Sequence, residues 1–507
     1  MNRERTASGR EWAALAGVLA LALALRLFKA DAALWYDEIF TLVNFVRLPT
    51  GQLIASYDSL NNHMLYSLAA QACVAVLGEN PLALRLPAIL LGIGSIFVQW
   101  RISRRVTGPV PALIVALLLA LSYHHIWFSQ NARGYTGLLF LTSWATLAFI
   151  QGMERPGWKI WTGYGLLVAA AMYMHMSAGF FFVAHGAVYA LMLTRHWPRR
   201  EGSDSTGVQR WQGARTLMPI YGIGLSIFVT LLLYAPIIGQ AVRTIGEVSE
   251  ASSSAKGAAL AEWRNPLRTL QEVGASISSA GPLVPVILLG VVLVLAAGVV
   301  TLYRRHPVLT AIYVVHVPLA TLLLYLAGVR IWPRYFLVDI GFIMMAVVEG
   351  VQVWSGLIAS TLKFGGKPVA DARWFFRFGT VTMVLVSLAL MVPNYLHPKQ
   401  DFPAARDYVL RYAQPDDSIA VVGLAGFVYT QYFQEPRFKI VETGADLERL
   451  RRTTKGSTWL VMAFPRQTMK ARPDVEAEVA RNFTDMDDFP GTLGDGAIQT
   501  FISKSAR

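Results

Sequence analysis

Charged residues are scarce in this chain of 507 residues, and cysteine is nearly absent. Asp, Glu, Lys and Arg make up 15% of the sequence, whereas an ordinary soluble protein contains about 25%. Together with an apolar fraction of 54%, this deficit excludes a plain soluble enzyme, a disordered protein and a coiled coil. The single cysteine, Cys73, excludes disulfides within the chain and any zinc site built from several cysteines.

The net charge of +13 is confined to the apolar part of the chain. From residue 397 onward, 15 Lys and Arg balance 15 Asp and Glu, so the whole excess lies in the first 396 residues. A nucleic-acid partner requires a basic patch on a soluble domain. Basic residues between apolar segments instead indicate loops retained on the cytoplasmic side of a membrane, and we expect no nucleic-acid partner.

Apolar segments long enough to cross a bilayer recur along the first 396 residues, since a span needs about 20 residues. They predict an α-helical polytopic membrane protein with about eleven transmembrane helices. The predicted spans are 12–29, 81–100, 109–127, 135–151, 159–175, 177–194, 217–239, 282–303, 307–328, 335–358 and 376–396.

One further apolar stretch, His63–Leu77, is short for a crossing. If it does not cross, all the basic loops fall on the same side as the N-terminal arginines, which is the positive-inside pattern. If it does cross, every later basic loop faces outward. We therefore expect an interfacial helix in the first outer loop, a cytoplasmic N-terminus, and outer segments that hold most of the unusual polar residues.

Helical and strand-like patterns alternate after residue 397 and predict a small α/β domain. The expected helices are Phe402–Tyr412, Gly426–Phe433, Leu447–Thr453 and one near Asp474–Asn482; the expected strands are Ser418–Val422, Phe438–Val441 and Thr458–Ala463. The chain is thus expected to divide into a membrane module, 1–396, and an extracytoplasmic domain, 397–507.

Two adjacent carboxylates, Asp37 and Glu38, follow two aromatic residues in the first outer loop. They point to different faces of whatever element holds them, so one can face a cavity as a general base while the other makes structural hydrogen bonds. A solvated interfacial turn is the alternative. His63 and Tyr66 open the interfacial helix, where His63 could bind an anion, a metal or a sugar, and the preceding Asn residues could simply cap the helix.

Histidines, arginines and tyrosines gather in the other outer segments. The stretch Tyr123–Tyr135 contains His124, His125, Arg133 and Tyr135. Arginine suits paired hydrogen bonds to a phosphate, although an arginine there could also snorkel to lipid headgroups. His175 ends a span on the same side, where a satisfied interfacial histidine is the alternative.

The last outer loop contains Arg330, Arg334 and Tyr335 around Trp332. Ionisable groups near membrane depth are costly, so they indicate function. The pattern predicts a phosphate clamp beside an aromatic surface; the alternative is an arginine that only anchors the end of the span.

These motifs, in this order and on this side, resemble the GT-C type membrane glycosyltransferases, which include the dolichyl-phosphate-mannose–protein mannosyltransferases and the aminoarabinose transferases of lipid A. The matching features are Asp37-Glu38, the His63 helix start, and the segments Ala83–Pro87, Gln130–Tyr135 and Arg334–Leu337. The His-Pro-Pro form of the helix start common in the family reads His63-Met64-Leu65 here. The resemblance covers residues 10–350.

The resemblance implies an enzyme of a bacterial-type inner membrane that moves a hexosyl or pentosyl group from a polyprenyl-phosphate sugar to an acceptor hydroxyl on the outer leaflet. Asp37 matches the acidic base of the family, and direct displacement with one base implies inversion. The acceptor can be a glycolipid, a polysaccharide or a protein, and a divalent metal ion is possible. A transporter or flippase of a lipid-linked sugar is the alternative, although neither inverted repeats nor midplane polar groups are evident.

Overall fold

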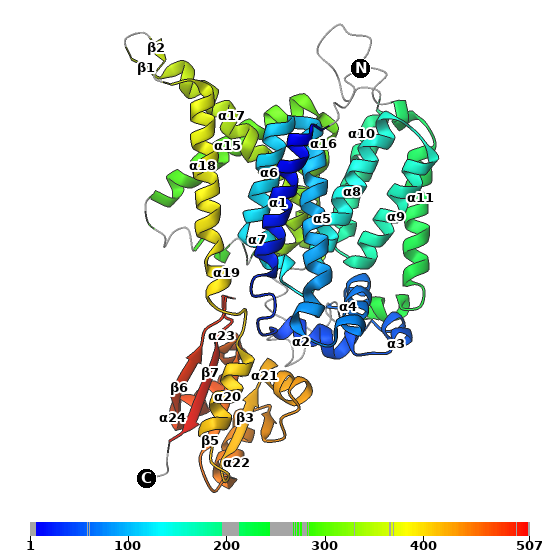
Figure 1. Ribbon diagram of the computed structural model, residues 1–507. Coiled ribbons are helices and arrows are strands. Elements are labelled where there is room, and N and C mark those ends of the chain that lie inside the picture. Colours follow the sequence, from blue (N-terminus) through cyan, green and yellow to red (C-terminus); the bar gives the residue numbers. More distant parts are fainter. Residues whose placement is uncertain are drawn as a thin grey trace.

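The described residues form a bundle of helices, with a small sheet below it (Figure 1). The computed structural model describes residues 7–194 except 58 and 60, 212–243, 281–328 except 282, 330–364, 367–368 and 370–504 except 493, with 267, 269, 271, 272, 274 and 275. Most of the segment between the predicted spans 217–239 and 282–303 lies outside the described residues.

Each of the predicted spans contains helical residues, although 109–127 comprises two helices and 335–358 begins in a 3₁₀-helix. The bundle consists of α1 (Gly9–Leu27), α5 (Pro81–Thr107), α6 (Pro109–Leu121), α7 (Tyr123–Ser129), α8 (Tyr135–Glu154), α9 (Trp158–Met174), α10 (Ala178–Leu193), α11 (Met218–Tyr234), α15 (Leu283–Arg305), α16 (Pro307–Leu326), α17 (Ile340–Thr361) and α18 (Ala372–Met391). Among the described residues, six helices are long and apolar enough to cross a membrane, or seven if α6 and α7, bent by 59°, form one span. The number of eleven crossings therefore stays a prediction.

Local sequence explains where these helices begin and bend. Asn80 caps α5 by accepting a hydrogen bond from the Ala83 amide at 2.8 Å, and Pro81 occupies the first turn, where its missing N–H costs nothing. Gly108, with φ of +92°, separates α5 from α6. Ser122 ends α6 in an extended conformation and caps α7, which turns the chain toward the loop before α8.

Short helices gather at the lower end of the bundle (Figure 1). They are α2 (Tyr36–Thr41), the π-helix η1 (Leu42–Val46), α3 (Thr50–Ala55) and α4 (Met64–Leu77), and the 3₁₀-helix η6 (Pro333–Asp339) leads into α17. The strands β1 (Lys363–Phe364) and β2 (Lys367–Pro368) lie at the opposite end, and η3 (Gln212–Arg215) precedes α11. The predicted interfacial segment is thus a separate helix, α4, which packs against α5 and α9.

The C-terminal part forms a mixed five-stranded sheet in the order β4-β3-β5-β7-β6. Its strands are β3 (Ser418–Val422), β4 (Phe438–Val441), β5 (Thr458–Ala463), β6 (Phe483–Phe489) and β7 (Ile498–Ser503), and its helices are α20 (Phe402–Tyr412), α21 (Leu424–Phe427), α22 (Gly444–Thr453), α23 (Pro465–Ala471) and α24 (Pro473–Asn482), with the π-helix η7 (Val428–Tyr432). The first three strands are parallel, whereas β7 runs antiparallel to β5 and β6. A small α/β unit at the C-terminus is confirmed; β6 and β7 were not predicted.

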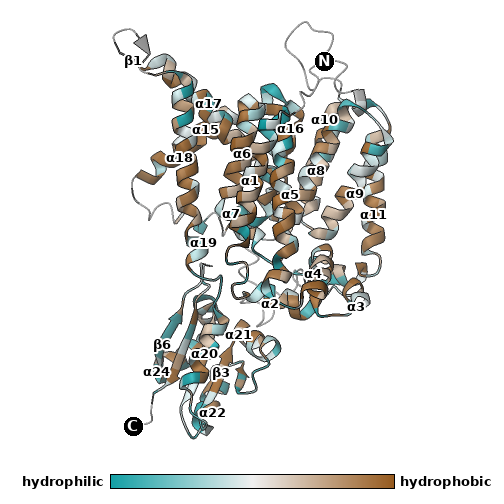
Figure 2. Ribbon diagram, viewed as in Figure 1, coloured by the Kyte–Doolittle hydropathy of each residue, from teal (hydrophilic) through white to brown (hydrophobic). Residues whose placement is uncertain are grey.

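The two parts differ in the hydropathy of their residues (Figure 2). The bundle is mostly hydrophobic on its outside, while hydrophilic residues cover much of the C-terminal sheet and its helices. The most apolar stretch of α15 has a mean hydropathy of 3.0 with 6% of it buried, and that of α18 has none buried. These helices present almost their whole length to the surroundings, as expected for lipid-facing spans.

Candidate active site

Polar residues from five segments converge at the lower end of the bundle, where α2 meets η6 and the turns before α4, α8 and α10. Seven of the twelve predicted site residues lie in this cluster. They are Asp37, His63, Arg133, Tyr135, His175, Arg334 and Tyr335.

The two adjacent carboxylates of α2 have separate environments. Glu38 is fully buried and forms two hydrogen bonds with Arg85, of 2.8 and 2.5 Å. It also accepts from the backbone amides of Ala132, at 2.8 Å, and Trp35, at 3.3 Å. Burial raises the pKa of Glu38, but the charge and hydrogen bonds of Arg85 outweigh burial and leave that pKa below its ordinary value. Glu38 is therefore an ionised carboxylate whose acceptors are occupied.

Asp37 lies on the other side of α2 and keeps 20% of its side chain exposed. Its carboxylate forms an ion pair with Arg133, whose own side chain is only 6% exposed. Among the described residues, the Nε atom of Arg133 is buried without a hydrogen-bond partner. Asp37 is thus partly exposed to solvent and is paired with Arg133, a buried cation whose Nε–H group can still donate a hydrogen bond.

His63 connects Arg133 to the following turn. Its Nε2 lies 3.1 Å from the Arg133 guanidinium, and its Nδ1 lies 3.0 Å from the backbone amide of Gly134. Both neighbours are donors, yet a neutral imidazole has one acceptor nitrogen. Burial, aided by the nearby charge of Arg334, lowers the pKa of His63 to about 3, so the ring is neutral at ordinary pH.

Aromatic rings surround this histidine. The ring of His175 lies 4.4 Å from that of His63, and Tyr135 lies 5.4 Å from His63 and 5.0 Å from His175. The Arg133 guanidinium lies 5.3 Å from the Tyr135 ring. The two histidine rings and Tyr135 thus form an aromatic wall beside the Arg133 guanidinium.

The segment η6 closes this side of the cluster. The guanidinium of Arg334 lies 4.9 Å from the centre of the Trp332 ring and 5.9 Å from that of the Tyr335 ring. The guanidinium of Arg330 lies 3.9 Å from the centre of the same Trp332 ring. Arg330 also pairs with Glu272 and donates from Nε to the Thr269 hydroxyl at 3.1 Å. Of the two predicted arginines, Arg334 acts on His63 and Arg133 through its charge, and Arg330 forms an ion pair with Glu272.

Three further predicted residues lie outside the cluster. Tyr66 is fully buried and donates to the Leu84 carbonyl at 2.7 Å. His125 lies inside the bundle between Arg26, at 2.7 Å, and the Ser95 hydroxyl, at 2.8 Å. His124 is exposed beside Tyr123. Their contacts are those of packing and surface residues, and their predicted role in donor binding stays untested.

Metal-ligating residues do not gather in the described part of the chain: no three His, Cys, Asp or Glu side chains there could hold one ion together. The carboxylates of Asp37 and Glu38 instead face arginines. The described chemistry of the cluster is therefore that of cations, a carboxylate and aromatic rings.

Comparison with known proteins bears on the family and the fold of the chain. The family model described as dolichyl-phosphate-mannose-protein mannosyltransferase matches residues 63–203. The crystal structure of ArnT from Cupriavidus metallidurans bound to undecaprenyl phosphate is similar over 98% of this chain and 99% of that one, with 13% identity and a TM-score of 0.50. The apo structure of the same ArnT is similar over 97% and 98%, also with 13% identity and a TM-score of 0.50. No curated protein sequence matches the chain.

The resemblance to the GT-C glycosyltransferases is confirmed. At 13% identity the likeness to ArnT is one of fold. It spans the bundle and the C-terminal sheet, because nearly the whole of both chains is covered.

Two neighbours of the site were not predicted from the sequence, and both come from the segment that joins α19 (Pro393–Leu396) to α20. Lys399 is buried; its ammonium donates to the Gln130 carbonyl and lies 5.1 Å from the Trp127 ring. Burial lowers the pKa of Lys399 to about 7, opposed by the charge of Glu38. The Gln400 side chain accepts from the Tyr36 amide at 2.9 Å. The sequence feature that could have indicated these neighbours is the pair Lys399 and Gln400, which follows the last predicted span.

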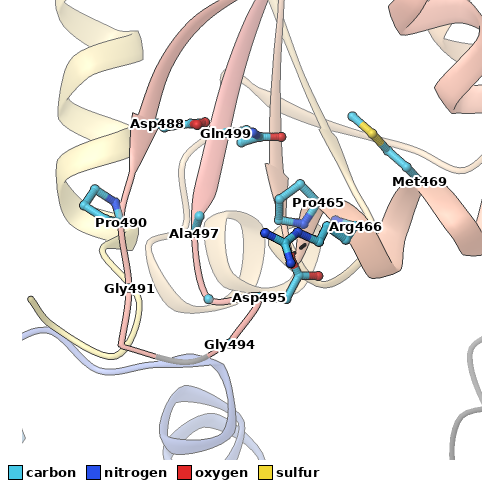
Figure 3. A pocket seen from close by; sticks show the side chains of 11 residues that line it. Pro465, Arg466, Met469, Asp488, Pro490, Gly491, Gly494, Asp495, Ala497 and Gln499 are labelled. Carbon is cyan, nitrogen blue, oxygen red and sulfur yellow. Dashed lines mark hydrogen bonds between the residues drawn. The ribbon is translucent and has the colours of Figure 1, made fainter. Parts of the chain in front are cut away.

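A pocket of about 290 Å³ lies in the C-terminal unit, between α23 and the loop that joins β6 to β7 (Figure 3). Arg466, Asp488, Asp495 and Gln499 supply its polar lining. Asp495 accepts from the backbone amide of Gln467 at 3.0 Å, which fixes the start of α23. The same loop runs back to the segment of Lys399, since the Thr492 amide donates to the Pro398 carbonyl at 3.0 Å.

Proposed function

We propose that the chain is a membrane glycosyltransferase that moves a sugar from a polyprenyl-phosphate donor to an acceptor hydroxyl on the outer face of an inner membrane. The observation that carries this proposal is the pairing of Asp37, partly exposed, with the buried Arg133 beside His63 and Arg334. The family match and the ArnT fold support the class of reaction.

In the proposed reaction, Asp37 accepts the proton of the acceptor hydroxyl. The hydroxyl oxygen then attacks the anomeric carbon from the face opposite the phosphate, and the bond between that carbon and the phosphate oxygen breaks. The configuration inverts, and polyprenyl phosphate leaves as a phosphate monoester. Its developing charge is stabilised by Arg133 and Arg334, which are most effective in a water-poor site.

Arg133 serves both halves of this reaction. It holds Asp37 in the ion pair, and its buried Nε is a further donor that a phosphate oxygen can use. The aromatic rings of Tyr135, Tyr335 and Trp332 provide a surface for the sugar or the first isoprene units. Glu38, saturated by Arg85 and two amides, is assigned a positioning role.

The membrane orientation belongs to the same proposal. The cluster, the short helices and the C-terminal sheet all lie at one end of the bundle (Figure 1). We assign that end to the extracytoplasmic side, because the basic loops predicted to be cytoplasmic belong to the other end. The membrane module is then 1–396 and the extracytoplasmic domain 397–507.

The deciding experiment uses the purified full chain with radiolabelled polyprenyl-phosphate sugars and candidate acceptors. Asp37→Asn should lower the rate of transfer by about 10²–10⁴-fold, the usual contribution of a general base. Asp31→Asn, an exposed aspartate six positions earlier, is the matched control and should retain the rate. Unchanged transfer by folded Asp37→Asn would exclude Asp37 as the base, and movement of intact lipid without transfer would favour a transporter.

A further inference from the structure

The segment between the last span and the C-terminal sheet reaches back into the site. Asn394 donates to the Gln130 side chain at 3.0 Å, and Lys399 donates to the Gln130 carbonyl. Gln130 itself donates to the carbonyls of Arg26 and Phe28, at 3.0 and 2.7 Å. One glutamine therefore ties α1, α7 and the 394–400 segment together.

The Gln130 carbonyl begins the short turn that carries the cationic residue of the site. Two residues later, the Ala132 amide donates to Glu38, and Arg133 follows with its ion pair to Asp37. Lys399 therefore contacts Gln130, the first residue of this turn. The third and fourth residues, Ala132 and Arg133, bind the two carboxylates of α2. A shift of its ammonium would change where the Arg133 guanidinium lies.

The position of Lys399 is in turn set by the C-terminal unit. A Cβ atom added at Gly491 would lie 2.3 Å from the Lys399 carbonyl oxygen, far inside van der Waals contact. The adjacent Thr492 amide donates to Pro398. The loop between β6 and β7 thus packs directly on the backbone of Lys399, and only glycine fits at residue 491 without moving it.

We propose that Lys399 is a positioning residue through which the C-terminal domain holds the Gln130–Arg133 turn in its phosphate-binding geometry. This inference rests on the proposed function. It assigns the C-terminal domain a part in donor binding, exerted by the contact of Gly491 with Lys399 and of Lys399 with Gln130.

The test measures binding of undecaprenyl phosphate to the purified full chain, which needs no knowledge of the sugar or the acceptor. Lys399→Met removes a charged donor and should weaken binding by about tenfold or more. Lys399→Arg keeps a cation and donor and should restore most of the affinity. Because loss of fold would also weaken binding, each variant is first compared with the unaltered chain by thermal unfolding.

Two glycines of the same loop give the decisive comparison. Gly491→Ala should weaken binding about as much as Lys399→Met, since it displaces the lysine backbone. Gly494→Ala is the matched control, because a Cβ atom there meets nothing within 4 Å. In the double variant Gly491→Ala/Lys399→Met the affinity should fall no further than in Lys399→Met alone, because Gly491 acts through the lysine.

The outcomes separate the two proposals. If the unaltered chain does not bind undecaprenyl phosphate, the proposed function fails. If it binds, and Gly491→Ala or Lys399→Met binds equally well, the positioning role of Lys399 is refuted. Losses that multiply in the double variant, or a Lys399→Arg variant as weak as Lys399→Met, also refute it.

Discussion

The ion pair of Glu38 and Arg85 predicts a large and specific loss of stability when its acid is neutralised. Glu38 is fully buried, and the Arg85 side chain is 3% exposed. In Glu38→Gln the carboxylate is replaced by an amide with one acceptor oxygen, while Arg85 and the amides of Ala132 and Trp35 still point at it. Breaking a buried pair by removing one partner costs about 3–5 kcal/mol of unfolding free energy.

A double variant sharpens the estimate. Replacing both residues by apolar ones, as in Glu38→Met/Arg85→Met, removes the uncompensated charge and often restores stability. Here recovery should be partial, because Arg85 also donates to the carbonyls of Ala30, Ala32 and Ala33, which would lose their donor. The double variant should therefore lie between the unaltered chain and Glu38→Gln.

The assay is unfolding of the purified full chain in mixed micelles with rising denaturing detergent, followed by tryptophan fluorescence. The matched control is Glu79→Gln, which neutralises an acid of the exposed Arg47–Glu79 pair. Such exposed pairs contribute about 0–1 kcal/mol. If Glu38→Gln loses no more stability than Glu79→Gln, the assignment of Glu38 as a structural carboxylate is refuted.

Three further predictions concern the same end of the bundle. Burial holds the pKa of His63 at about 3, below the value of about 6.5 for an unfolded histidine, so the folded state should lose stability as pH falls through about 6.5. In His63→Gln the thermal unfolding temperature should therefore depend less steeply on pH. An unchanged slope would contradict this prediction. Gly134→Ala places a Cβ atom 2.6 Å from the Met174 carbonyl and 2.8 Å from His63 Nδ1, so binding of undecaprenyl phosphate should weaken at least about tenfold, whereas Gly163→Ala, which meets nothing within 4 Å, should bind normally. His316→Leu leaves Asp339, 3.0 Å away in the bundle, as a buried carboxylate without its histidine, and should cost about 3 kcal/mol of unfolding free energy in the same micelle assay; a loss within the range of Glu79→Gln would show that this pair is not a stabilising one.

Much of the fold is predictable from the sequence because hydropathy determines which segments form spans. The α20, β3, β4 and β5 elements have the predicted bounds, since each is a short run with a clear period between turn residues. The strand β6 was missed because its sequence, Phe483–Phe489, contains three aspartates and little apolar alternation. It forms as an edge strand paired only to β7, where charged side chains are favoured.

The candidate site was only partly predictable for a different reason. Sidedness brings Asp37, His63, Arg133 and Arg334 to one end of the bundle, but it does not determine which acid is buried. Which acid is buried depends on Arg85, the fifth residue of α5, whose guanidinium donates a hydrogen bond to Glu38 in the protein interior. Lys399 was beyond reach because its contact with Gln130 joins residues 269 positions apart, and no local pattern encodes such a distance.

The helix α18 connects the surrounding lipid to this contact. Its most apolar stretch has none of its residues buried, and α19 and the 394–400 segment follow it directly. A lipid-facing helix adjusts its tilt when the thickness of the hydrocarbon layer changes. Since Lys399 lies a few residues beyond the end of α18, bilayer thickness should tune how firmly the Arg133 turn is held, and reconstitution in lipids of different chain length offers a physical control over the site without any mutation.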